Sequence, residues 1–142
     1  MDYQIRRKKS ELDSTGYMEI GPGKYAGKHW QEGFLFVWED AFGMAEGVVL
    51  KYFNSYDHFG MNEIPKDTGV LISAEWRKAA DNLPAADASE YPSLLNLDAA
   101  YRSNLEAEVS GNKQSISQLL IELADSLDEF YKTEDWVCIL GM

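Results

Sequence analysis

The chain has 142 residues, a formal net charge of −11 and an apolar content of 45%, with aromatic residues making up 13%. Disorder requires few apolar and aromatic residues, so the composition excludes a disordered chain, and the length predicts a single domain over residues 1–142. The acidic balance excludes nucleic acid as a natural partner, because phosphate binding needs a basic surface, and it favours a cationic partner instead.

The N-terminal part predicts two short strands, at residues 3–6 and 17–20, and a turn at residues 21–23. Apolar residues then recur at helical spacing, which predicts a long central helix over residues 34–54. A strand over residues 34–38 is the alternative, but the helical period continues for about five turns. We expect Gly60 to stop the chain in a left-handed turn, and Pro65 to start a second helix that ends near Leu83.

The C-terminal part predicts two more helices and a strand. The third helix follows Pro92 and ends at Gly111, and its apolar residues are Leu94, Leu97, Ala100, Tyr101 and Leu105. Ser115 and Gln118 have the spacing of a capping box at the start of the last helix. The apolar face of that helix contains Ile116, Leu119, Leu120, Leu123, Leu127, Phe130 and Tyr131.

Residues 136–140 are β-branched and aromatic, and the segment is too short for a helix. We expect it to form a strand that closes a small antiparallel sheet with the N-terminal strands. The predicted fold is therefore an α+β domain dominated by about four helices.

The negative charge is concentrated in the C-terminal part of the chain. Residues 80–142 contain 12 acidic and 3 basic residues, whereas residues 1–79 contain 12 and 10. On the last helix, one face is formed by the carboxylates of Glu122, Asp125, Asp128 and Glu129. Like charges three or four residues apart repel by ~0.2–0.5 kcal/mol, and Lys132 is the only base nearby in sequence. This face is predicted to bind a partner protein with a basic surface; a plain solvated face is the alternative.

Two further features suggest other functions. His58 lies between Asp57 and Glu63, and a histidine beside acids can act in general acid–base catalysis; a turn after the helix is the structural alternative. Gly43 and Gly47 each cost about 1 kcal/mol relative to alanine within a helix. They predict either the close approach of another helix of the same chain or a surface through which the chain dimerises, and the oligomeric state stays open.

The sequence contains no strong motif for catalysis, a cofactor or a metal. His29, His58 and Cys138 lie too far apart to predict a metal site, and a thiol in an apolar strand is usually inert. A single cysteine excludes a disulfide scaffold. The sequence contains no apolar run of about 18 residues, so it predicts no membrane span. The N-terminus has basic residues but no apolar segment behind them, so we expect a cytoplasmic protein without a signal peptide.

Short sequence segments resemble those of small bacterial immunity proteins of toxin–antitoxin competition systems, including the partners of contact-dependent inhibition toxins. The segments are EDAF at residues 39–42, YDHFGMNEI at 56–64, the Leu-rich acidic helix, and DWVCILG at 135–141. Together they cover about half of the chain, and they carry over no toxin-contacting residue. The resemblance implies a cytoplasmic, non-enzymatic protein that binds and blocks one cognate toxin, and many such toxins are basic nucleases.

Overall fold

A four-stranded antiparallel sheet brings together distant parts of the chain in the computed structural model, which describes residues 1–97 and 102–141. The strand order is β2-β1-β4-β3. The strands are β1 (Tyr17–Pro22), β2 (Leu35–Trp38), β3 (Met61–Pro65) and β4 (Trp136–Leu140). The predicted strand at residues 136–140 is confirmed, and it lies between β1 and β3.

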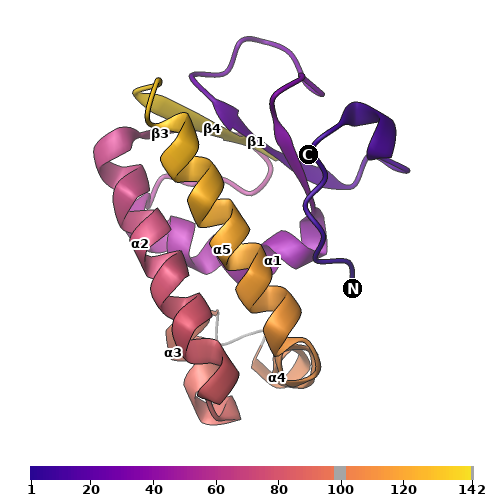
Figure 1. The fold of residues 1–142 in the computed structure, drawn as a ribbon, viewed down its shortest axis with the longest axis vertical. Helices are drawn as coiled ribbons and strands as arrows, with labels where there is room; N and C mark the ends of the chain where they lie inside the picture. Colours follow the sequence, from indigo (N-terminus) through magenta and orange to yellow (C-terminus); the bar gives the residue numbers. More distant parts are fainter. Residues whose placement is uncertain (98–101, 142) are drawn as a thin grey trace.

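The helices cover one face of this sheet, and the two longest, α2 and α5, lie side by side (Figure 1). The helices are α1 (Glu39–Tyr52), α2 (Lys66–Asn82), α3 (Tyr91–Leu95), α4 (Arg102–Gly111) and α5 (Lys113–Phe130). Helix α2 is tied to α1 by the buried indole of Trp76, which donates to the carbonyl of Ala45 at 3.0 Å. The helix-dominated α+β class predicted from the sequence is confirmed. Among the residues described, no helix combines the length and apolarity that crossing a bilayer requires.

The prediction of a helix from residue 34 is wrong at its N-terminal end. Leu35–Trp38 is strand β2, which pairs with β1, and the helix begins only at Glu39. The residues of β2 are buried on both faces of the sheet: Leu35 and Val37 contact the helices, and Phe36 lies in a cluster on the other face. A strand buried on both faces has a continuous apolar sequence, which periodicity alone does not separate from a helix.

The prediction of a left-handed stop at Gly60 is also wrong. Helix α1 ends at Tyr52, and Gly60 is not among the glycines with positive φ. Met61–Pro65 then forms β3, a strand missing from the prediction, and α2 starts directly after Pro65. The alternation of exposed and buried residues in β3 is typical of a strand, but its five residues include a proline and a glutamate, which are depleted in strands.

The predicted third helix is divided in two. Helix α3 ends at Leu95, because Asn96 adopts a left-handed conformation with φ 53°. Helix α4 ends at Gly111 as expected, while Ala100 and Tyr101 lie outside the described residues. Helix α5 begins at Lys113, so Ser115 lies inside the helix rather than at its cap.

The predicted strand at residues 3–6 is reduced to a single β-bridge. Arg6 exchanges two backbone hydrogen bonds with Phe36 of β2, at 2.8 and 2.9 Å. Tyr3 and Ile5 are nevertheless buried in the core that the helices form with the sheet. The N-terminal segment therefore covers the outer edge of β2 without extending the sheet by a full strand.

A second, smaller apolar cluster covers the face of the sheet opposite the helices. It consists of Tyr17, Phe34, Phe36, Cys138 and Leu140. The loop between β1 and β2 lies over this cluster and contributes Tyr25 and Trp30 to it. We call this side the outer face of the sheet, and the candidate site lies on it.

Candidate functional site

The acidic face predicted on the last helix is present on α5 but is partly neutralised. Arg77 of α2 forms ion pairs with Asp125 at 2.8 Å and with Asp128 at 2.5 Å. Lys132 pairs with Glu129 at 2.8 Å, as its position in the sequence suggested. Lys132 is the only base nearby in sequence but not in the fold, because Arg77, 48 residues from Asp125 in sequence, lies beside it.

Asp128 also links the two long helices. Its carboxylate accepts a hydrogen bond from the hydroxyl of Ser73 at 2.8 Å in addition to the ion pair with Arg77. Asp125 and Glu129 are more exposed, with 62% and 70% of their side chains accessible. Asp128 therefore links α2 to α5, whereas Asp125 and Glu129 face the solvent.

His58 is held between two glutamates of α1, at the end of the sheet where β3 begins. Its Nε2 lies 2.6 Å from Glu39 Oε1, and its Nδ1 is bonded to Glu46. Glu46 also accepts a hydrogen bond from the hydroxyl of Tyr56 at 2.7 Å. Glu39 and Glu46 are seven residues apart, so they lie on the same side of the helix. This group attaches the loop after α1 back onto the helix.

The predicted partners of His58 have other roles. Asp57 accepts a hydrogen bond from the backbone amide of Phe59 at 3.0 Å, and Glu63 accepts one from the backbone amide of Tyr25 at 3.0 Å. Asp57 therefore shapes the turn that contains Phe59, and Glu63 fixes the loop on the outer face of the sheet.

The electrostatics of this group favour a charged imidazole. Burial lowers the pKa of His58, but hydrogen bonds to Glu39 and Glu46 outweigh it and raise the pKa above its ordinary value of 6.5. An imidazolium has two N–H donors, one for each carboxylate. Burial and the neighbouring carboxylate of Glu46 raise the pKa of the Tyr56 hydroxyl far above its ordinary range. Both nitrogens of His58 are occupied, so neither is free to take a proton from a substrate in this arrangement.

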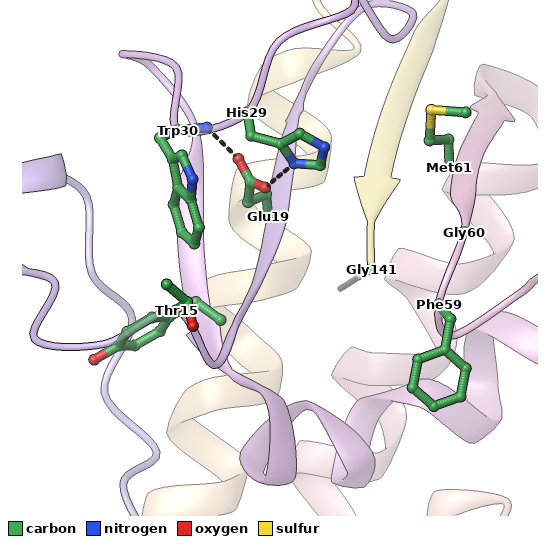
Figure 2. A pocket seen from close by; sticks show the side chains of 9 residues that line it. Thr15, Glu19, His29, Trp30, Phe59, Gly60, Met61 and Gly141 are labelled. Carbon is green, nitrogen blue, oxygen red and sulfur yellow. Dashed lines mark hydrogen bonds and ion pairs between the residues drawn. The ribbon is translucent and has the colours of Figure 1, made fainter.

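A hollow of about 360 Å³ lies on the outer face at the same end of the sheet (Figure 2). One wall comes from the loop between β1 and β2, and the other from the start of β3. Its largest lining side chains are Tyr17, Glu19, His29, Trp30, Phe59 and Met61. We call this feature the sheet-end hollow.

Glu19 is the buried charge of the hollow. Only 2% of the residue is exposed, and its Oε2 lies 2.6 Å from Nδ1 of His29. Its Oε1 accepts the backbone amide of Trp30 at 2.5 Å. Trp30 has a positive φ of 59° and stacks on Phe36, with ring centroids 5.8 Å apart. The carboxylate of Glu19 thus holds the loop, and the indole of Trp30, in place above the sheet.

The opposite wall exposes two large apolar side chains. Phe59 is 71% exposed and Met61 is 60% exposed. The end of β4 passes between the two walls, where the amide of Gly141 donates to the carbonyl of Gly60 at 2.8 Å (Figure 2). A β-carbon on Gly141 would collide with the carbonyl of His58, so only glycine permits this close approach. The hollow and the His58 group therefore share one corner of the fold.

Sequence reasoning did not identify this hollow. Glu19 was available as a signal, since a carboxylate inside an apolar strand demands a partner. Its partners, His29 and Trp30, come from a loop whose path the sequence pattern does not predict. Phe59 and Met61 lie in a segment for which the sequence pattern predicts a turn followed by the start of a helix.

The two candidate glycines of α1 have different surroundings. Gly47 faces the end of α3, where a β-carbon would lie 2.1 Å from the carbonyl oxygen of Asn96. A β-carbon on Gly43 would meet nothing within 4 Å. The close approach predicted for this face thus takes place within the chain at Gly47, against α3 rather than a second copy.

No group of three or more histidine, cysteine, aspartate or glutamate residues within the described ranges is arranged to hold a metal ion. Cys138 is buried in the outer cluster, and burial raises the pKa of its thiol to about 11. Comparisons with protein-family models, curated proteins and solved structures found no match to this chain.

Proposed function

We propose that this chain is an acidic protein-binding domain that docks a partner with a basic surface at the sheet-end hollow. The observation that supports it most is the exposure of Phe59 and Met61 beside the hollow. Large apolar side chains grouped on a surface commonly mark sites of protein or ligand binding. Interfaces also place such residues at a desolvated centre with a polar rim.

Charge complementarity favours a basic partner. The chain carries a net charge of −11, and the carboxylates of Asp13 and Asp57 lie beside residues of the hollow. Arg6 contacts the hydroxyl of Tyr17 at the same rim, but its charge is already paired with Asp2 at 2.5 Å. A cationic surface would therefore meet these two carboxylates beside an apolar centre, and complementary fields speed such encounters.

We assign the acidic face of α5 to long-range attraction of the same partner. Its residues Glu122, Asp125, Asp128 and Glu129 belong to the helix layer, whereas the hollow lies on the outer face of the sheet. Exposed charges outside the contact area change the association rate and its salt dependence more than the dissociation rate. The partly neutralised face retains four carboxylates against two cations.

The finer proposal is that the partner is a bacterial toxin, which the chain binds and neutralises in the cytoplasm without catalysis. This proposal rests on the resemblance of the sequence segments at residues 39–42, 56–64 and 135–141 to those of immunity proteins. Covering a cationic surface of such a toxin would exclude its substrate.

The test starts from the chain purified from its host with its bound protein, which is then identified and purified separately. Binding of the two purified proteins is measured by biolayer interferometry. We expect the double variant Phe59→Ala, Met61→Ala to bind about tenfold or more weakly, because central apolar anchors contribute ~1–2 kcal/mol or more each. Leu71→Ala is the matched control, since Leu71 is 50% exposed on α2, away from the hollow.

A second pair of variants tests the long-range attraction. Asp125→Lys with Glu129→Lys should slow association several-fold at low salt and leave dissociation unchanged. Asp128 is kept, because it holds Ser73 and Arg77. A partner that binds the Phe59/Met61 double variant as tightly as the native chain would show that the docking surface is wrong.

A further inference from the structure

We propose that the sheet-end hollow is a binding site for one arginine side chain, whose guanidinium group pairs with Glu19. This inference rests on the proposed function, that a basic protein docks at this hollow, and it names the group that enters. The guanidinium would lie at the carboxylate, and its aliphatic stem would lie between Trp30 and Met61.

The carboxylate of Glu19 has hydrogen-bond acceptor positions that no donor of the described residues occupies. A buried charge is costly unless it is paired and hydrogen-bonded. Each oxygen of Glu19 makes one hydrogen bond, to His29 or to the amide of Trp30, although each can accept two. In the described parts of the chain, Glu19 forms no ion pair with a lysine or an arginine. Acceptor capacity therefore remains at the base of the hollow.

The walls suit a flat cation on a long stem. The indole of Trp30 is held from behind by Phe36, and the ring of Tyr17 lines the same hollow. Guanidinium groups stack on aromatic rings and are weakly hydrated, so arginine enters such a site at a smaller desolvation cost than lysine. A volume of about 360 Å³ is at the small end for ligand sites, which suits one side chain.

His29 controls access to the carboxylate. It lies between Oε2 of Glu19 and the ring of Tyr25, and 44% of its side chain is exposed, so the imidazole stands between the carboxylate and the solvent. A guanidinium group that replaces it would form charge-assisted hydrogen bonds with the carboxylate, which are stronger than neutral ones. Removing the imidazole should therefore expose the anion and strengthen binding.

The experiment is an NMR titration of the full-length chain with two peptides, acetyl-Gly-Arg-Gly-amide and its citrulline counterpart. Citrulline has nearly the same shape as arginine but carries no charge. We expect saturable shifts at the Trp30 indole and the Met61 methyl group, and about tenfold tighter binding of the arginine peptide, since hydrogen bonds between charged groups are stronger than those made by a neutral urea group.

Three variants locate the effect. Glu19→Gln should abolish the preference for arginine, whereas Glu63→Gln should keep it. Glu63 is the matched control because it accepts the amide of Tyr25 from the same loop and lies outside the hollow. His29→Ala should bind the arginine peptide more tightly than the native chain does.

Equal binding of the two peptides, absence of binding, or an unchanged preference in Glu19→Gln would overturn the inference. If Glu19→Gln does not fold, the peptide comparison on the native chain and on His29→Ala decides. The proposed function is judged separately, by the effect of the Phe59/Met61 double variant on the purified partner.

Discussion

Replacing Gly47 with alanine should destabilise the fold, although alanine is the better helix former. Gly47 lies in the middle of α1, and a β-carbon there would lie 2.1 Å from the carbonyl oxygen of Asn96 and 2.9 Å from that of Leu95. The obstacles are backbone atoms, so no side-chain rotation relieves the collision. Either α3 must move away from α1 or the helix must distort.

The magnitude follows from two opposing contributions. Alanine in place of a helical glycine stabilises by about 1 kcal/mol, whereas overpacking a close contact costs ~1–3 kcal/mol. A separation of 2.1 Å from a backbone oxygen places the cost at the upper end, so we expect a net loss of about 2 kcal/mol. Gly43→Ala is the control, because its β-carbon meets nothing within 4 Å and should stabilise by up to about 1 kcal/mol.

Urea and thermal unfolding followed by tryptophan fluorescence measure both variants. At about 3 °C per kcal/mol for a chain of this length, Gly47→Ala should melt about 6 °C below the native chain and Gly43→Ala up to about 3 °C above it. If both alanines stabilised the fold equally, the contact between α3 and α1 would not exist in solution, and the reasoning would be refuted.

Two further predictions follow from the ionisable groups. Because the pKa of folded His58 is raised, its ion pairs contribute stability that is fully present below about pH 6.5 and is lost as pH rises through the folded-state pKa. The urea midpoint of the native chain should therefore fall over this range more than that of His58→Gln, and parallel pH profiles would contradict the expected pairing. The Cys138 thiol, with burial raising its pKa to about 11, should resist a thiol reagent in the folded chain and react fully after unfolding in urea; rapid labelling without denaturant would show that the strand is not buried.

The sequence was most informative where a pattern or a length permits only one structure. Helix α5 was located from its amphipathic stripe. Strand β4 is buried on both faces, but it was located because a five-residue apolar run is too short for a helix. The transition at Trp38–Glu39 was not found, because β2 is buried on both faces and its apolar residues continue the spacing of α1. Residues 35–38 form a strand because they pair with β1, which is distant in the sequence.

The candidate site depended still more on contacts between distant residues. His58 was singled out beside Asp57 and Glu63, but its partners in the fold, Glu39 and Glu46, are 19 and 12 residues away. The seven-residue spacing of Glu39 and Glu46 places them on one side of a helix, and the sequence shows this spacing. The sequence does not show that the chain after α1 turns back and brings His58 to that side. Arg77 was missed on the acidic face for the same reason, since only the packing of α2 on α5 brings it to Asp125.

The position of β4 also constrains the order in which the fold can be assembled. The last strand in sequence pairs with both β1 and β3, so β1 can pair only with β2, and β3 cannot join the sheet, until residues 136–140 are in place. Pairing between β1 and β4 closes a loop of more than one hundred residues, and such distant contacts slow folding. We therefore expect a late kinetic step in which the helices have already formed and the inserted strand completes the sheet, and with it the corner that holds the hollow.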